Sequence, residues 1–401
     1  MKRIYLDYAA TTPVGPAVKK AMVPFFSERF GNTMSIHSFG QEAKLALEEA
    51  RETVAGLMGA KPNEIIFTGS ATESNNLALK GIIFAKLIVH KNQRSSISMD
   101  GLHIIISAIE HPCIMETANW LEKQGIKITR IPVDKEGLVN PLDIKKAITK
   151  ETVLVSIIHG SNEIGTVQPI KEIGAFIKNA NHKLKTKIYF HTDAVQSFGK
   201  IPIDVNKMNI DLLTTSSHKI YGPKGAACLF VREGVKIEPI LHGGGQEDGL
   251  RSSTVNLPAI VGFAKACEIA KKGMGEESQR LIRLRDKLIS KILKIPNSHL
   301  IGSKNNRLPN IVNFWFPFIE GESLVIQLDL KGIAASTGSA CSSMKLEPSY
   351  VLMALGLRPE QAHSSLRISL GRQTKESDLD YLNDNLSKII KKLREISPYG
   401  K

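Results

Sequence analysis

Strand-like and helix-like segments alternate from about residue 40 to residue 235, and this alternation constrains the fold more than any other feature. Residues 41–58 carry apolar side chains at helical spacing and end at Gly59. Short apolar runs then alternate with helical segments such as 171–184. The predicted strands are 64–68, 103–107, 126–131, 152–158, 187–191, 211–215 and 226–231. This pattern predicts an α/β fold in which a mostly parallel sheet is sandwiched by helices.

The pattern changes after Pro258. The remaining chain contains two charged helical segments, two strands and two further helices: 258–273, 276–294, 310–316, 364–370, 321–331 and 375–395. A chain of 401 residues exceeds what one hydrophobic core usually serves. We therefore predict a large domain (14–257) and a smaller α+β C-terminal domain (258–401), with the N-terminal strip (1–13) returning to the smaller one. The Ser- and Lys-rich stretch 90–101 is expected to be an exposed loop.

Composition excludes several classes of protein. The longest apolar stretches are strand-sized, well short of the roughly 20 apolar residues that cross a bilayer, and no signal segment precedes Ile4. We therefore expect a cytoplasmic protein without membrane association. The net charge of +14 is spread over helix faces, and aromatic residues make up 6% of the chain, so nucleic-acid binding is not expected. The same positive field would favour an anionic substrate or an acidic partner.

Four cysteines are present, at positions 113, 228, 267 and 341, with no Cys-x-x-Cys pair. This spacing favours neither a metal site nor a disulfide framework. Cys228 and Cys267 lie in apolar segments, where buried structural cysteines are expected. Cys341 differs, because it lies in the small, polar run 336–343. A thiol on such a loop could reach a buried substrate and then an outside acceptor, although an incidental exposed cysteine would have the same surroundings.

Polar residues stand where several predicted strands end, and this is the edge at which open α/β sheets bind ligands. Residues 68–73 (Thr-Gly-Ser-Ala-Thr-Glu) follow one strand and open a helix, which suits an anion or a simple helix cap. Asp193 and Lys219 end two further strands. An acid on one strand and a lysine on the next fit pyridoxal phosphate (PLP), whose ring nitrogen pairs with a carboxylate and whose aldehyde bonds a lysine. A helix cap and a surface lysine are the structural alternatives.

Two more residues complete the predicted site. His111 follows the strand at 103–107, where it could stack on a flat cofactor ring or merely satisfy local hydrogen bonds. Arg367 lies in a C-terminal strand and offers a planar fork to a substrate carboxylate, with a structural salt bridge as the alternative.

In combination, these residues resemble the cysteine desulfurases of the NifS/IscS type, which are class V aminotransferase-like PLP enzymes of fold type I. The resemblance runs over nearly the whole chain, from the motif at 5–13 (Tyr-Leu-Asp-Tyr-Ala-Ala-Thr-Thr-Pro) to the motif at 369–372. It implies that Lys219 is the Schiff-base lysine, that Asp193 partners the pyridinium nitrogen and that His111 stacks on the ring as an acid or base.

The resemblance also assigns the remaining contacts. Cofactor contacts are implied for Gln196 at the phenolic oxygen, for Ala71, Thr72, Ser216 and His218 at the phosphate, and for Asn162. Thr254 would reach the phosphate of a neighbouring subunit, which implies a homodimer. Asn162 and Arg367 resemble substrate binders, and Cys341 resembles the persulfide-forming cysteine on a loop at 336–345.

The implied activity is conversion of L-cysteine to L-alanine, with the sulfur passing through Cys341 to an acceptor protein such as an iron–sulfur scaffold. The sequence departs from the family at Thr33, where proline is usual, and at Ser161, where asparagine is common; it also stops at Lys401 without the acceptor-docking tail of some members. A selenocysteine lyase, a class V transaminase and a cofactor-free basic binding protein are the alternatives.

Overall fold

A seven-stranded sheet forms the centre of the computed structural model, which describes residues 3–92, 101–184, 187–338 and 347–397. The strand order is β2-β8-β7-β6-β5-β3-β4. Their bounds are β2 (Ile65–Thr68), β3 (His103–Ser107), β4 (Lys127–Ile131), β5 (Thr152–Ser156), β6 (Tyr189–Asp193), β7 (Leu212–Ser216) and β8 (Ala227–Val231). Within this sheet β8 is antiparallel to β2 and β7, whereas the other pairs are parallel. The predicted α/β class and mostly parallel sheet are confirmed.

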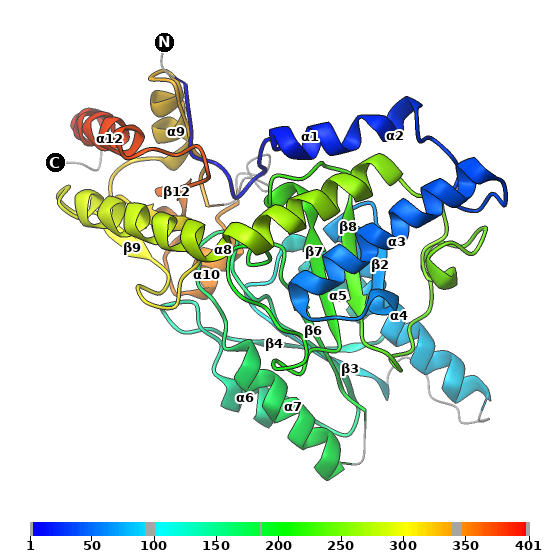
Figure 1. The fold of residues 1–401 in the computed structure, drawn as a ribbon. Coiled ribbons are helices and arrows are strands. Elements are labelled where there is room, and N and C mark those ends of the chain that lie inside the picture. The colour runs from blue at the N-terminus through cyan, green and yellow to red at the C-terminus, as the bar shows by residue number, and fades with distance from the viewer. Residues whose placement is uncertain (1–2, 93–100, 185–186, 339–346, 398–401) are drawn as a thin grey trace.

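Helices cover both faces of this sheet. Alternate residues of a strand point to opposite faces: Ile105 packs in one buried cluster, and Ile104 packs in the other. The first cluster lies under α3 (Ser38–Met58), α6 (Pro141–Ala147), α7 (Ile170–Leu184) and the first half of α8 (Leu257–Ile292). The second lies under α4 (Ala71–Asn92) and α5 (Pro112–Lys123). In Figure 1, α3 and α8 cross in front of β7 and β8.

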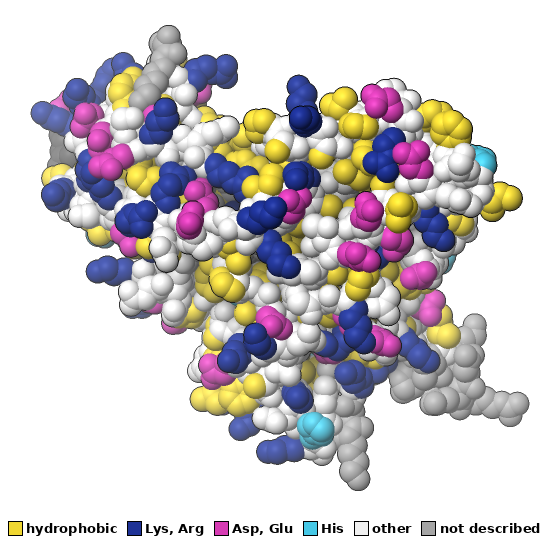
Figure 2. Space-filling model, in the orientation of Figure 1, with side chains coloured by type: hydrophobic (Ala, Val, Ile, Leu, Met, Phe, Trp, Pro, Cys, Tyr) yellow, Lys and Arg dark blue, Asp and Glu magenta, His cyan; other side chains and the backbone are white. Residues whose placement is uncertain are grey.

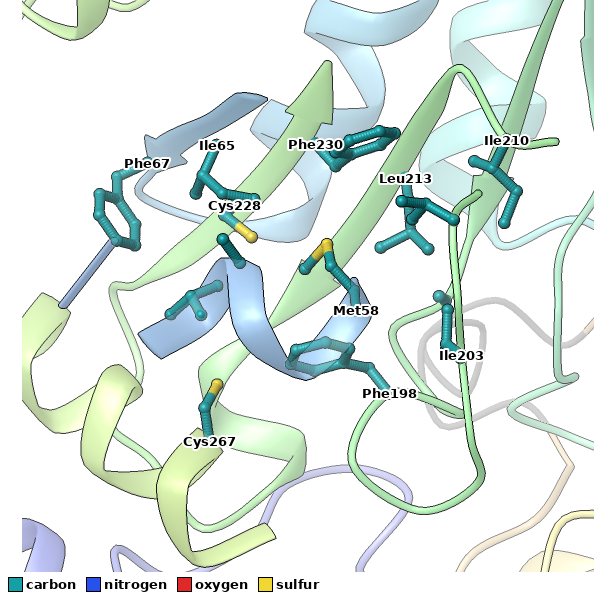
Figure 3. Close-up of a cluster of buried hydrophobic side chains, with 14 of the residues drawn as sticks. Met58, Ile65, Phe67, Phe198, Ile203, Ile210, Leu213, Cys228, Phe230 and Cys267 are labelled. Carbon is teal, nitrogen blue, oxygen red and sulfur yellow. The ribbon is translucent and has the colours of Figure 1, made fainter. Parts of the chain in front are cut away.

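The first cluster contains two of the four cysteines. Figure 3 shows Cys228 on its strand and Cys267 on α8, among side chains such as Phe198 and Met58. Both thiols are completely buried, and burial raises the pKa of each. The prediction that these two cysteines are buried structural residues is confirmed.

A second, smaller assembly contains the C-terminal part of the chain. Strands β9 (His299–Ile301), β10 (Ile311–Trp315) and β12 (Ser365–Ser369) form an antiparallel sheet in the order β12-β10-β9. Its hydrophobic cluster includes residues of α9 (Gly321–Asp329) and α12 (Glu376–Ile396). The N-terminal strip packs here: β1 (Ile4–Tyr5) pairs with β11 (Ile333–Ala334), and Ile4 and Leu6 belong to the same hydrophobic cluster. The domain boundaries at 13/14 and 257/258 stay a prediction.

One predicted break is wrong. The segments 258–273 and 276–294 form a single helix, α8, which runs from the large sheet to the small assembly (Figure 1). Gly273 and Gly275 favour a break in isolation. The helix continues because its first half packs in the large cluster and its second half packs in the small one. Helix α4 likewise extends through Asn92 into the predicted 90–101 loop, most of which lies outside the described residues.

Candidate active site

The carboxyl ends of the parallel strands border a cavity of about 440 Å³. Ten residues predicted from the sequence line it: Ala71, Thr72, His111, Asn162, Asp193, Gln196, Ser216, His218, Lys219 and Arg367. Most of them lie at or just beyond strand ends, where an open α/β sheet places its ligands. The small assembly contributes Arg367, so the cavity lies between the large sheet and β12.

The junction of β2 and α4 forms one end of the cavity. Helix α4 begins at Ala71, so the N–H groups of its first turn have no partner within the helix and favour an anion. Glu73 lies in the same turn, but its carboxylate accepts hydrogen bonds from the backbone N–H of Gly69 at 2.9 Å and from Nε of Arg251 at 2.7 Å. The acid is therefore paired, and the exposed helix start suits a phosphate.

Asp193 ends β6 at the floor of the cavity and is 4% exposed. Its Oδ1 accepts a hydrogen bond from the backbone N–H of Val195 at 3.0 Å, and its Oδ2 accepts one from Nδ2 of Asn75 at 2.7 Å. These donors hold the carboxylate in one orientation. A buried, oriented carboxylate opposite a helix start and a lysine fits the ring nitrogen, phosphate and aldehyde of PLP.

Lys219 ends the short turn that follows β7. Its Nζ donates to the carbonyl oxygens of Ala9 and Ala10, each at 2.7 Å. Nε2 of Gln196 donates to the same oxygen of Ala9 at 2.9 Å. Carbonyl oxygens of the N-terminal strip therefore bind the side chains of Lys219 and Gln196, two residues predicted to contact the cofactor.

His111 caps helix α5, and this contact fixes its tautomer. Its Nδ1 accepts the backbone N–H of Cys113 at 3.2 Å and lies 3.0 Å from the Cys113 Sγ. Burial lowers the pKa of His111, so the ring is neutral near pH 7. A neutral ring whose Nδ1 accepts a hydrogen bond must carry its own proton on Nε2. His111 therefore presents an N–H group, rather than a lone pair, at Nε2.

Basic side chains around the cavity have altered proton affinities. Burial, followed by the charge of Lys219, lowers the pKa of Lys200 to about 7. Burial and the neighbouring lysines lower the pKa of His218 to about 4, so this imidazole is neutral at physiological pH. The Oγ1 of Thr11 lies 3.1 Å from its Nδ1. The local field is positive and favours an anionic cofactor.

Two buried carboxyl groups next to predicted site residues were not anticipated. Burial raises the pKa of Glu110 to about 8 and that of Glu163 to about 7. The Oε1 of Glu110 accepts hydrogen bonds from Oγ of Ser107 at 2.5 Å and from the backbone N–H of Ile158 at 2.8 Å. Glu163 lines the cavity, and its Oε2 accepts Oγ of Ser349 at 2.6 Å. The sequence could have indicated both, because Glu110 directly precedes His111 and Glu163 directly follows Asn162.

Two predicted site residues are not among the described residues that line the cavity. Thr254 is exposed at the surface, three positions from the Arg251 that pairs with Glu73. Cys341 and most of the predicted loop 336–345 lie outside the described residues. The residues on either side of that gap are near the cavity: Ser336 pairs with Arg367 through backbone hydrogen bonds, and Ser349 donates to Glu163.

The chain matches known proteins over its full length. Residues 4–382 match the family model described as aminotransferase class-V. The protein named cysteine desulfurase IscS from Dictyoglomus turgidum is 50% identical, covering 100% of this chain and 98% of that protein. The one from Methanosarcina thermophila is 49% identical, covering 99% and 94%. This chain belongs to the cysteine desulfurases of the class-V aminotransferase family.

Solved structures agree with this membership. A NifS-like protein superposes with a TM-score of 0.88 at 37% identity, covering 97% of this chain and 100% of that one. The structure titled SspA in complex with cysteine gives a TM-score of 0.78 at 38% identity, covering 92% and 98%. Cysteine desulfurases of this family are PLP enzymes of fold type I, so the predicted fold class and cofactor are confirmed. Within the described ranges, no helix is long and apolar enough to span a membrane.

Proposed function

We propose that this cysteine desulfurase binds L-cysteine in the 440 Å³ cavity and transfers its sulfur to Cys341. The substrate C–S bond breaks, an S–S bond forms on Cys341, and the thiol proton of Cys341 balances the new C–H bond of L-alanine. The observation that carries the proposal is the convergence of Asp193, Lys219 and Arg367 on one cavity. A cofactor site and a carboxylate-binding guanidinium thereby meet in one place.

Each cavity residue has a role in this scheme. Lys219 would bond the cofactor, Asp193 would pair with its ring nitrogen, and Gln196 would contact its phenolic oxygen. The phosphate would lie against the start of α4 and its surroundings, at Ala71, Thr72, Ser216 and His218. When bound, PLP withdraws electrons from the substrate carbon that bears the amino group.

The tautomer of His111 decides which side chain removes a proton and which one donates a hydrogen bond. His111 presents N–H at Nε2, because its Nδ1 is occupied by the helix cap. We therefore assign α-proton removal to Nζ of Lys219, and hydrogen-bond donation in the cavity to Nε2 of His111. Asn162 and Arg367 would bind the substrate carboxylate.

Transfer to Cys341 requires its thiolate, since a neutral thiol is a poor nucleophile. Arg367 lies next to Ser336 and Glu163 next to Ser349. Both flanks of the segment that contains Cys341 therefore adjoin the cavity, which supports the proposal that this cysteine receives the sulfur.

A homodimer is the proposed assembly. Large apolar side chains are exposed along the N-terminal helices and the segment that joins them to α3: Val23, Phe26, Phe30, Met34, Ile36 and Phe39. Figure 2 shows hydrophobic side chains gathered over this region, near α1 (Pro16–Met22) and α2 (Pro24–Ser27). Patches of this kind mark interfaces. Exposed Thr254 would then reach the phosphate in the partner subunit.

The sulfur acceptor proposed is another protein, such as an iron–sulfur scaffold, in the cytoplasm. The net charge of +14 favours an acidic acceptor.

Incubation with isotopically labelled L-cysteine, followed by mass spectrometry of peptides, tests the proposal. We expect one additional sulfur on Cys341 and stoichiometric L-alanine. The Cys341→Ser variant should retain the colour of the bound cofactor and lose sulfide release from cysteine. Unchanged turnover of this variant would remove Cys341 from the mechanism, and a keto acid in place of alanine would indicate a transaminase.

A further inference from the structure

Asp7 forms an ion pair with Arg367, a residue that lines the cavity. Its Oδ1 accepts a hydrogen bond from Nη2 of Arg367 at 2.9 Å, across a separation of 360 positions. The Arg367 side chain is 3% exposed and that of Asp7 is 18% exposed. The pair connects the N-terminal strip to β12 beside the proposed substrate site.

The backbone of Asp7 is held independently of its side chain. Asp7 forms a parallel bridge with Ser369, and Oη of Tyr5 donates to the Asp7 carbonyl oxygen at 2.9 Å. The backbone N–H of Ser369 donates to Leu6 at 2.8 Å. Removing the Asp7 carboxylate should therefore leave the strip in place, so the carboxylate has another role.

The guanidinium of Arg367 keeps donors for a ligand. It has five N–H groups. Asp7 engages Nη2, and the carbonyl oxygen of Asn162 accepts from Nη1 at 3.0 Å. Its Nε is buried and has no hydrogen-bond partner among the described residues. A buried donor without an acceptor is costly, and a carboxylate would satisfy it.

We propose that Asp7 is a positioning residue that orients Arg367 for the carboxylate of the amino-acid substrate. The inference rests on the proposed function and extends it to the N-terminal strip. Asp7 and Asn162 hold the two Nη atoms from different sides and fix the plane of the fork. A planar carboxylate binds the fork through two parallel hydrogen bonds, and the remaining N–H groups allow it to bind together with Asp7.

L-alanine and ethylamine test this proposal on the holoenzyme, because they differ by the carboxylate and neither contains sulfur. Binding is followed by the change in cofactor absorbance. We expect Asp7→Asn to weaken L-alanine binding roughly tenfold, the fold-change typical of one hydrogen bond to a charged group, and to leave ethylamine binding unchanged. In steady-state assays, KM for L-cysteine should rise by the same factor while kcat is retained.

A second variant and an arginine control complete the test. Asp7→Glu keeps the charge but moves it by one methylene, so it should weaken L-alanine binding roughly threefold and leave ethylamine binding unchanged. Unchanged or tighter L-alanine binding in both variants would overturn the proposal. If Arg367→Lys also left L-alanine binding unchanged, the proposed substrate site itself would be wrong. A loss with Arg367→Lys alone would reject only the role of Asp7.

Discussion

The cavity has two walls that are built in different ways. The wall proposed for the cofactor consists of the ends of β2, β6 and β7, which belong to one hydrogen-bonded sheet, and the start of α5, where Cys113 lies. The opposite wall contains Glu163 and Arg367, and Asp7 pairs with Arg367 behind it; these three residues come from separate parts of the sequence. A strand ladder fixes the first wall, whereas individual side-chain contacts fix the second. Stability should therefore be concentrated in the first wall, and substrate recognition should be adjustable through the second.

The largest effect is expected from a buried ion pair that supports the β2 end of the cofactor wall. Arg51 on α3 donates to both carboxylate oxygens of Glu247, at 2.7 and 2.8 Å, and Glu247 accepts the backbone N–H of Phe67 in β2 at 2.7 Å. The two side chains are 10% and 1% exposed. Glu247→Gln leaves the buried guanidinium with only the half-exposed Glu48 as a counter-charge, which should cost about 3 kcal/mol of unfolding free energy, as measured by chemical denaturation.

An exposed ion pair provides the matched control for this substitution. Glu233 pairs with Lys61 at 2.6 Å, but their side chains are 62% and 67% exposed. Glu233→Gln makes the same chemical change in solvent, so the denaturation midpoint should not move. Equal effects of the two substitutions would show that the buried pair does not support the cofactor wall.

The opposite wall, which is proposed to bind the substrate, should make stability depend on pH. Burial raises the pKa of Glu163 from 4.5 to about 7, and the hydrogen bond from Ser349 and the charge of Arg367 oppose this rise. The unfolded chain therefore releases this proton at lower pH than the folded chain, and the stability due to the neutral carboxyl is lost between about pH 4.5 and pH 7. Glu163→Gln removes this dependence. Relative to the wild type, the variant should gain roughly 2 to 3 kcal/mol between pH 5 and pH 8.

Denaturation at both pH values measures this gain. Glu322→Gln, at an exposed position on α9, is the control and should follow the wild type at both pH values. A parallel pH profile for Glu163→Gln and the wild type would mean that Glu163 is already ionised in the folded protein, as a second anion beside Arg367.

The two walls also differ in how far the sequence predicts them. Asp193 and Lys219 were predictable because each ends a strand of a parallel sheet, and such ends converge on one edge. The contact between Asp7 and Arg367 follows from no local pattern. It depends on how the N-terminal strip pairs with β11 and β12, which tertiary packing decides.

Tertiary packing overrides or completes the local sequence pattern in two helices. The sequence predicted two helical segments, at 258–273 and 276–294, but packing against two separate clusters joins them into the single helix α8. The inward-facing Asn75 sits in the first turns of α4 and binds Asp193 across 118 positions. Helical periodicity alone places Asn75 on the buried face and cannot name its partner.

The smallest effect is expected for Cys113, the cysteine of the cofactor wall, which we compare with Cys341. Cys113 lines the cavity, but burial and the charge of Asp193 raise the pKa of its thiol to about 12. It is therefore protonated and a poor sulfur acceptor. Cys113→Ala should lower turnover less than about threefold, because the backbone N–H at this position still donates to Nδ1 of His111 and Asn75 still binds Asp193. Labelled cysteine should place its sulfur on Cys341 in this variant as in the wild type. Sulfur found on Cys113 in the wild type, or a loss of persulfide in Cys113→Ala, would show that Cys113 carries the sulfur. The two walls would then not separate cofactor binding from sulfur transfer.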